Sequence, residues 1–418
     1  MSGADPDAGA EVFTGSFTQQ EPIPEAAIEA ALAVLRHGRL HRYNTAAGEI
    51  AETALLEEEF AAFTGARYCL AVASGGYALG AALRALGVGP GDRVLTNAFT
   101  LAPVPGAIAA LGAIPVFVET TADLTIDLDD LAARAPGARA LLLSHMRGHI
   151  CDMARLMALC DAAGLPVIED CAHTMGAHWA GRHSGRWGAM GCYSTQTYKH
   201  MNSGEGGLVV SDDPALMARA ILLSGSYMLY PRHRAAPPPE AFAEAKYVTP
   251  NVSGRMDNLR AAILRPQLAD LPRQCGRWNA LYRIVEEGLA GTPGIALIAR
   301  PAAEGFVASS FQFRLPGWTA AKVGAFLARA AVRGVELKWF GAPEPQGFTS
   351  THRSWRYAPA QALPRTDRVM AELIDMRLPL TFSRQDAAQV ARILRAEIGA
   401  VHQADEADVA EFVPPAAD

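Results

Sequence analysis

Short apolar runs alternate with amphipathic segments through the first half of the chain, and this alternation predicts strands separated by helices. The expected strands are residues 68–73, 93–96, 115–118, 140–144 and 166–169. The expected helices are residues 24–37, 49–63, 77–86, 103–111 and 152–163. Strands that alternate with helices favour an α/β fold built on a mostly parallel sheet.

The pattern changes near residue 251. Residues 251–268 follow the periodicity of one long helix, in which Pro266 is expected to introduce a kink. Beyond it, apolar runs predict strands and helices in mixed order, at residues 311–315, 320–333, 335–339 and 384–397. This mixture predicts a smaller α+β domain towards the C-terminus.

These patterns divide the chain into four parts. We expect a flexible N-terminal arm over residues 1–20 and a large α/β domain over residues 21–262. A small α+β domain is expected over residues 263–400. Residues 401–418 are acidic and rich in alanine and proline, a composition typical of a disordered tail.

Composition excludes several classes of protein. The 418 residues carry a formal net charge of −6, so neither a nucleic acid nor an anionic membrane is an expected partner. The N-terminus lacks the apolar segment of a signal peptide. Residues 98–118 are uncharged and long enough to cross a bilayer, but their prolines and glycines predict a loop, a helix and a strand instead.

The six cysteines point to a reducing compartment. None forms a C-x-x-C pair, and most lie in apolar runs, as reduced core cysteines do. We therefore expect a cytoplasmic protein without disulfides.

Candidate chemistry lies where the predicted strands end. In open parallel sheets, ligands bind beyond the carboxyl ends of the strands. The residues at these positions are Ser74, Asn97, His145, Asp170 and Ser194.

Two strand-end segments carry groups suited to cofactor chemistry. VIED at 167–170 ends on Asp170, which serves either as a helix N-cap or as the carboxylate that keeps a pyridine nitrogen protonated. Lys199 lies in YSTQTYKHMNSGEGG at 193–207, a polar, glycine-rich loop. It is either an exposed lysine or a nucleophile whose pKa is lowered by burial or by nearby cations.

Two further polar segments precede predicted helices, and each is a candidate for a binding role or simply for a helix cap. Ser74, Gly75 and Gly76 open a predicted helix, whose free N–H groups either attract a phosphate or are simply capped. The polar segment PNVSGRMD at 250–257 precedes the long helix, and Ser253 is a candidate cap for it.

Together, in this order and spacing, these motifs resemble those of the DegT/StrS-type family of sugar aminotransferases, which depend on pyridoxal 5′-phosphate (PLP). The resemblance covers residues 30–400. The matching segments are EDCAH at 169–173, STQTYK at 194–199 with GEGG at 204–207, SGRM at 253–256 with AA at 261–262, and SHMRG at 144–148 with DM at 152–153.

The resemblance implies a PLP-dependent transferase of fold type I. Its large domain holds a mixed, mostly parallel sheet, and its C-terminal domain is smaller and α+β. It implies a homodimer whose active sites are shared between subunits. It also implies transfer of an amino group from glutamate or glutamine to a keto-sugar or cyclitol-like acceptor, in sugar, antibiotic or polysaccharide biosynthesis.

The resemblance also assigns catalytic roles. Lys199 is implied to form an aldimine with the cofactor and to carry protons, with a pyridoxamine phosphate intermediate between the two half-reactions. Asp170 is implied to pair with the pyridinium, and His173 to lie near the phenolic oxygen of the cofactor. Ser74, Gly75 and Ser194 are implied to hold the phosphate, with Gln196 as a further cofactor contact.

Several positions depart from the family pattern. Gly76 stands where relatives commonly have threonine, and Leu101 where an aromatic residue often stacks on the cofactor ring. Ser253 aligns with the interdomain asparagine, while Asn251 lies two residues earlier, so either of the two is a candidate for completing a phosphate site.

Three residues are candidates for binding the substrate, namely His145, Arg147 and Arg255. Arg147 stands where relatives often have an uncharged aromatic residue. Its guanidinium suits an anionic group on the acceptor. The alternative is a structural ion pair with Asp152 or Glu169.

Other functions remain open at this point. The same fold supports PLP-dependent dehydratases and isomerases, although the presence of Lys199, rather than a histidine, favours transamination. A non-catalytic regulator that binds PLP or a sugar is a second alternative. A metal enzyme using His145, His149 and Cys151 is a third, but these residues follow a strand and bracket Gly148, whereas such spacing suits a metal on a helix, so we expect no metal.

Overall fold

The computed structural model describes residues 11–405, and a seven-stranded sheet forms its centre in the order β1-β9-β8-β5-β4-β2-β3. Its strands are β1 (Tyr68–Val72), β2 (Arg93–Asn97), β3 (Ile114–Val118), β4 (Ala140–Ser144), β5 (Val167–Asp170), β8 (Met190–Ser194) and β9 (Gly207–Ser211). Only β9 pairs antiparallel with its neighbours, β1 and β8. The prediction of a mixed, mostly parallel sheet is confirmed, although β9 itself was not predicted.

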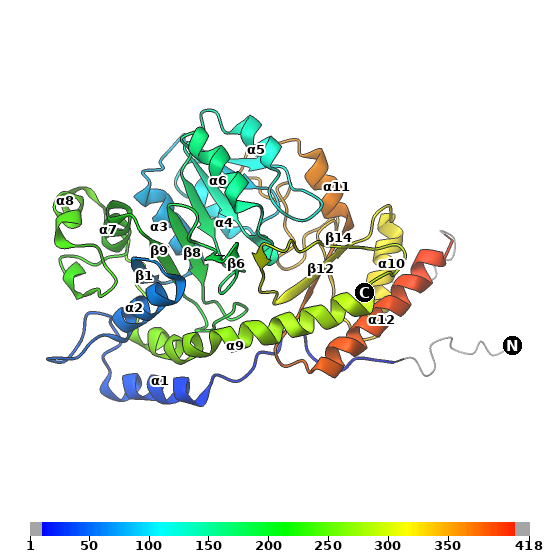
Figure 1. Ribbon diagram of the computed structural model, residues 1–418, viewed down its shortest axis with the longest axis horizontal. Coiled ribbons are helices and arrows are strands. Elements are labelled where there is room, and N and C mark those ends of the chain that lie inside the picture. The colour runs from blue at the N-terminus through cyan, green and yellow to red at the C-terminus, as the bar shows by residue number, and fades with distance from the viewer. Residues whose placement is uncertain (1–10, 406–418) are drawn as a thin grey trace.

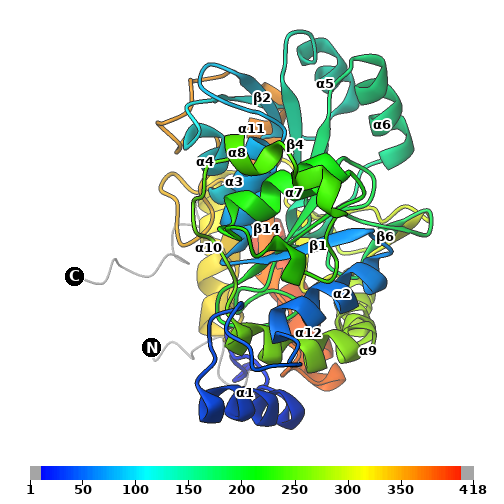
Figure 2. The same ribbon diagram turned by 90° about the vertical axis from the view of Figure 1, so that its left-hand side faces the viewer.

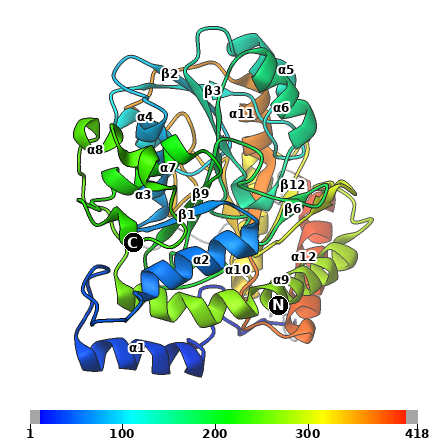
Figure 3. The same ribbon diagram turned by 60° about the vertical axis from the view of Figure 1, so that its left-hand side comes forward.

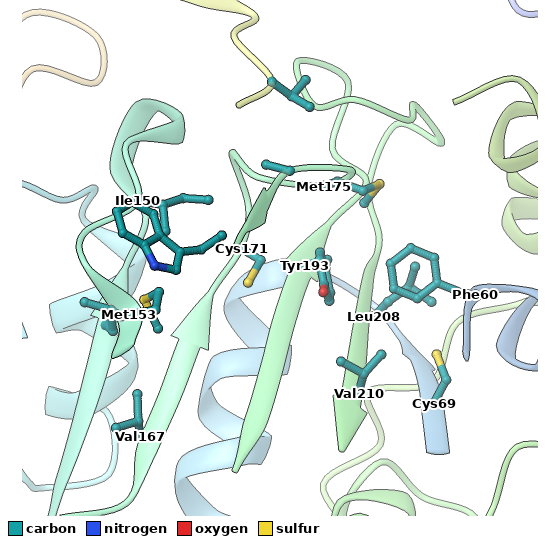
Figure 4. Packing of buried hydrophobic residues seen from close by; sticks show 14 of the residues in the cluster. Phe60, Cys69, Ile150, Met153, Val167, Cys171, Met175, Tyr193, Leu208 and Val210 are labelled. Atoms are coloured by element: carbon teal, nitrogen blue, oxygen red, sulfur yellow. The ribbon is translucent and has the colours of Figure 1, made fainter. Parts of the chain in front are cut away.

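Helices cover both faces of this sheet because successive strand residues point to opposite sides. One face packs against α2 (Glu52–Thr64), α5 (Leu128–Arg134), α6 (Met153–Ala162) and the first half of α9 (Asn258–Leu289). The other face packs against α3 (Gly75–Ala85), α4 (Pro103–Ala109) and α7 (Pro214–Leu223). Figure 4 shows the first face, where Phe60 of α2 lies beside Cys69, Leu208 and Val210 of the strands.

A second, antiparallel sheet has the order β10-β12-β14-β13. It consists of β10 (Ala296–Leu297), β12 (Ser310–Arg314), β14 (Leu373–Arg377) and β13 (Lys338–Trp339). The helices around it are α10 (Ala320–Val332), α11 (Pro364–Glu372) and α12 (Arg384–Gln403). The predicted strand 335–339 is thus much shorter, and β14 was not predicted.

A small third sheet joins the two halves of the chain. It has the order β11-β6-β7, formed by β11 (Glu304–Gly305), β6 (His178–Trp179) and β7 (Arg182–His183). The helix α1 (Glu25–His37) and four short helical segments complete the fold, the latter at α8 (Ala245–Val248), η1 (Met146–Gly148), η2 (Tyr230–Arg232) and η3 (Pro239–Phe242).

The helix α9 runs beneath both larger sheets (Figure 1). It contains 32 residues and begins after Asp257, whose side chain accepts a hydrogen bond from the Arg260 N–H. The prediction placed its start too early, at residue 251, and its end too early, at residue 268. The expected domain boundary after residue 262 therefore falls inside a continuous helix. Figure 3 shows α9 lying between α1 and α2.

Both ends of the described chain are packed against the small domain. Phe13 and Phe17 are buried and each meets the Phe382 ring edge-on at a centroid distance of 5.0 Å. Two side chains of the expected arm are thus held against the small domain, while residues 1–10 lie outside the described chain. Likewise, α12 continues to Gln403 with Val401 buried, so the expected tail does not begin at residue 401. Residues 406–418 lie outside the description.

Residues 98–118 fold as predicted into a loop, the short helix α4 and the strand β3. Across residues 11–405, no helix combines the length and the apolar character needed to cross a bilayer. All six cysteines are buried and free. Figure 2 shows the sheet from its β1 edge, with α7 and α3 on one side and α2 below.

Candidate active site

A cavity of about 310 Å³ lies between the large sheet and the small domain. The predicted site residues Leu101, Arg147, His173, Gln196 and Lys199 line it. The remaining walls come from elements far apart in the sequence. They are the N-terminal segment 20–24, the helix α9 and the end of β14 with the loop that follows.

Lys199 places a buried amine in this cavity. Its Nζ lies 2.9 Å from Nε2 of His173. Burial and the positive charge of Arg147 lower the pKa of Lys199 to about 8, although the Asp170 carboxylate acts in the opposite direction. A substantial fraction of this amine is therefore neutral near pH 8, as a nucleophile requires.

His173 is positioned to keep the lysine in its neutral form. Its Nδ1 accepts a hydrogen bond from the backbone N–H of Arg147 at 3.4 Å. A neutral ring therefore carries its proton on Nε2, where it donates to Nζ of Lys199. Burial and the charge of Lys199 hold the pKa of His173 well below its ordinary value. The ring is therefore neutral, and it serves as a donor to a free amine.

Asp170 is buried at the carboxyl end of β5. Its Oδ2 accepts the hydroxyl of Ser144 at 3.0 Å, and its Oδ1 accepts the N–H of Ala172 at 3.1 Å. Burial raises the pKa of Asp170, although the Ala172 N–H and the charge of Lys199 act in the opposite direction. No helix begins after Asp170 in the described chain, so its alternative role as a helix cap is excluded.

The N-terminus of α3 lies beside the loop that carries Lys199. Ser74 caps this helix by accepting the Tyr77 N–H at 3.0 Å, while a side chain at Gly75 would meet Cβ of Ser194 at 2.8 Å. Glycine therefore allows the helix end to approach Ser194. At Gly76 the nearest atom to an added Cβ would lie 3.9 Å away, which leaves space beside the helix N-terminus. Such space beside free N–H groups suits a phosphate.

The predicted residues Asn251, Ser253 and Arg255 form a separate group outside the cavity of the same chain. Oδ1 of Asn251 accepts the Ser253 N–H at 3.0 Å. Arg255 donates to the Gly225 carbonyl at 2.8 Å and to the Ser253 hydroxyl at 3.3 Å. The structure therefore does not bring these three residues to Lys199 within one subunit.

His145 does not reach the cavity, contrary to its expected role in binding the substrate. It is 1% exposed, and its Nε2 lies 3.0 Å from Oε2 of Glu169. Glu169 also accepts backbone N–H groups of Gly185, Trp187 and Gly188. Burial alone would raise the pKa of Glu169, but His145 and the N–H groups of Gly188 and Gly185 together outweigh burial, and the pKa is lowered. His145 therefore stabilises the end of the sheet.

Arg147 has an ion-pair partner that the sequence did not indicate. Its guanidinium lies 2.8 Å from Oδ2 of Asp375 in β14, and neither Asp152 nor Glu169 is its partner in the described chain. Gln312 donates to the other oxygen of Asp375 at 2.7 Å. Arg147 therefore forms a structural ion pair, but its partner is Asp375, and the pair links the large domain to the small domain.

The alternative metal site is not assembled. His149 bonds to Gln312 at 2.9 Å, while Cys151 lies against Met153 and His145 against Glu169. A different group, His145 with Glu169 and Cys171, is compact. However, the Glu169 oxygens already accept several N–H groups, as described above.

Sequence reasoning missed several cavity residues. Arg377 ends β14, and its guanidinium lies 3.9 Å from the ring centroid of Tyr198. His200 is buried against Trp278, and within residues 11–405 neither of its ring nitrogens has a partner. Burial lowers the pKa of His200 to about 3. The sequence offered one signal for His200 and Tyr198, since both adjoin Lys199.

The lysine, the carboxylate and the helix N-terminus together fit PLP. Lys199 offers an amine for its aldehyde, Asp170 a carboxylate for its ring nitrogen, and α3 a helix end for its phosphate. The space beside Gly76 is the specific structural observation that supports the phosphate end.

Comparison with curated proteins gives relatives that transfer amino groups. The chain is 38% identical over 247 residues to dTDP-3-amino-3,4,6-trideoxy-alpha-D-glucose transaminase of Streptomyces venezuelae, covering 58% of this chain and 61% of that protein. It is 32% identical over 283 residues to L-glutamine:2-deoxy-scyllo-inosose aminotransferase of Streptomyces kanamyceticus, covering 65% and 64%. The chain thus spans less than two thirds of each of these relatives.

A longer match is 3-amino-5-hydroxybenzoate synthase of Amycolatopsis mediterranei, 30% identical over 339 residues, with 76% of this chain and 82% of that protein covered. Among solved structures, S. venezuelae DesV in complex with a ketimine intermediate superposes with a TM-score of 0.75 at 30% identity, covering 91% and 95%. Residues 23–395 match the DegT/DnrJ/EryC1/StrS aminotransferase family as a whole. The chain therefore belongs to this family of aminotransferases.

Proposed function

We propose that this protein uses PLP to move an amino group from glutamate or glutamine to a keto-sugar or cyclitol-like acceptor. The observation that carries the proposal is the buried amine of Lys199. Burial and the charge of Arg147 lower its pKa to about 8, although the nearby Asp170 carboxylate acts to raise it. The names of the relatives support the substrate class, since they include an L-glutamine:2-deoxy-scyllo-inosose aminotransferase.

When bound, PLP supplies an aldehyde for amines and an electron-withdrawing ring. The protein supplies the groups around it. We expect Lys199 to carry the proton to and from the substrate carbon, a general acid–base role that requires its amine to reach both proton positions. His173 orients the amine of Lys199, and Asp170 offers a negative charge to a protonated ring nitrogen.

The decisive test is a donor and acceptor screen on the cofactor-loaded protein. Glutamate and glutamine labelled with ¹⁵N in the transferred amino group serve as donors, and 2-deoxy-scyllo-inosose as one acceptor. We expect the visible absorbance of the bound cofactor to fall on adding a donor and to return on adding an acceptor, with ¹⁵N in the product. A dehydratase or isomerase would release no labelled amine product, and a regulator would show neither change.

Capture of the cofactor is expected to depend on pH with a midpoint near 8. Below this pKa Lys199 is protonated and has no lone pair, so the rate should rise with pH and then level off. Stopped-flow absorbance on the cofactor-free protein, followed by borohydride reduction, measures this rate. A midpoint near the ordinary lysine value of about 10.4 would contradict the burial of the amine.

We expect a homodimer in which residues 251–255 reach the partner's cofactor phosphate. Large apolar side chains near this segment are exposed, including Tyr247 and Val248. Val248→Glu should therefore weaken the dimer in sedimentation experiments, while Val332→Glu, at an equally exposed position of α10, should not. A fully active monomer at working concentration would rule out a shared site.

A further inference from the structure

Arg377 is a cavity cation that the proposed function leaves unused. It ends β14, and its guanidinium lies 3.9 Å from the ring centroid of Tyr198 and 5.4 Å from that of Phe348. Within the described part of the chain, the guanidinium of Arg377 has no hydrogen bond or ion pair to another residue, whereas its backbone pairs with Ser310 of β12. Its guanidinium is therefore held against two rings while its N–H groups have no acceptor among residues 11–405.

Arg147 lies against the same Phe348 ring as Arg377. Its guanidinium lies 4.3 Å from the Phe348 centroid, so both arginines face one ring. Asp375 neutralises Arg147 at 2.8 Å. Because Asp375 and Arg377 lie two residues apart in β14, they project from the same face of the strand. Two cations, Arg147 and Arg377, therefore lie near one anion, Asp375.

The Nε–H group of Arg147 is a further hydrogen-bond donor that lacks an acceptor in the described chain. Arg147 is 8% exposed, yet its Nε is buried and has no hydrogen-bond partner among residues 11–405. A buried N–H without an acceptor costs free energy that a bound acceptor removes. Burial and then the charge of Arg377 act to lower the pKa of Arg147, while Asp375 acts in the opposite direction. An anion in the cavity would relieve this repulsion.

We propose that Arg377, supported by Arg147, forms a subsite for a carboxylate of the substrate that reacts at Lys199. The planar fork of a guanidinium matches the two oxygens of a carboxylate, and ring stacking fixes its plane in advance. The inference rests on the proposed function for the identity of the substrate. Two sources share this chemistry, namely the carboxylate of the amino-acid donor and an acidic group on the acceptor.

Calorimetry with glutarate, a dicarboxylate that has no amine to transfer, tests the subsite directly. In the cofactor-loaded protein, Arg377→Gln should weaken glutarate binding about tenfold to a hundredfold, the range expected for charge-assisted hydrogen bonds. Arg377→Lys keeps the positive charge but loses the planar guanidinium, so its affinity for glutarate should lie between those of the unchanged protein and Arg377→Gln. Arg314→Gln is the matched control, because Arg314 lies on the adjacent strand β12 and pairs with Glu372 outside the cavity.

Separate half-reactions distinguish the two sources. If Arg377 holds the donor, Arg377→Gln slows the reaction with glutamate but not that with the uncharged 2-deoxy-scyllo-inosose. If it holds the acceptor, the variant instead loses preference for 5-ketogluconate, a keto sugar with a carboxylate. Either result supports the subsite.

The subsite and the proposed function fail in different ways. Glutarate binding that is absent, or unchanged in Arg377→Gln, overturns the subsite whatever the activity. Binding that depends on Arg377 without any amino transfer supports the subsite and contradicts the function. Thermal unfolding of each variant, together with Arg377→Lys, separates loss of binding from loss of fold.

Discussion

Replacing Lys199 by alanine is expected to abolish both covalent attachment of PLP and amino transfer. Among the cavity residues within the described chain, Lys199 is the only lysine. His173 cannot replace it, because the pKa of its buried ring lies well below the ordinary value and its Nε2 is already directed at Nζ. Loss of the general acid–base alone costs about 10²–10⁴ in rate, and loss of covalent attachment adds to this.

Borohydride reduction followed by peptide mass spectrometry measures the attachment, and the visible absorbance of the bound cofactor gives an independent reading. Lys338→Ala is a suitable control because Lys338 lies in β13 and does not line the cavity. A reduced adduct on any lysine other than Lys199 would show that the assignment is wrong. Retained turnover in Lys199→Ala would lead to the same conclusion.

Asp170→Asn is expected to keep PLP bound while lowering the rate by several orders of magnitude, on the order of 10³. The amide can still accept the Ala172 N–H and donate to the Ser144 hydroxyl, so the fold should be unaffected. What is lost is the negative charge that stabilises a protonated ring nitrogen, on which electron withdrawal depends.

The measurement is kcat for amino transfer beside the absorbance of the bound cofactor. Asp213→Asn is the matched control, because Asp213 follows β9 and caps α7, the role that Asp170 does not have. Near wild-type turnover in Asp170→Asn would reduce Asp170 to a structural residue. A variant that no longer retains PLP would instead place Asp170 mainly in binding.

The local pattern of apolar and polar residues was sufficient to predict most strands of the large domain. Apolar runs bounded by polar residues predicted β1 to β5 within one or two residues, and the strand-end rule selected Asp170 correctly as a buried carboxylate. The segment of β9, GLVVS, is itself an apolar run that was overlooked, whereas its antiparallel pairing with β1, which is remote in the sequence, could not be inferred from the segment. Such pairing leaves no periodic signal in the segment itself.

The far wall of the cavity could not be predicted for the same reason. Asp375 and Arg377 reach the cavity only because β14 pairs with β12 some sixty residues earlier. Phe13 and Phe17 reach the small domain by packing on Phe382, and two aromatic residues in an otherwise mostly polar segment do not indicate which part of the chain they contact. The sequence named Arg147 but had no means to find its partner across the domains.

The continuity of α9 limits how the two domains can move. A helix with intact hydrogen bonds resists bending, so the small sheet cannot swing freely about a loop near residue 262. Pro266 and Pro272 each remove one helical hydrogen bond, from the carbonyls of Ala262 and Leu268. Any change in the angle between domains should therefore concentrate between these two prolines. Gln267 and Asp270 face the cavity from this same stretch, so bending there would alter the shape of the cavity directly.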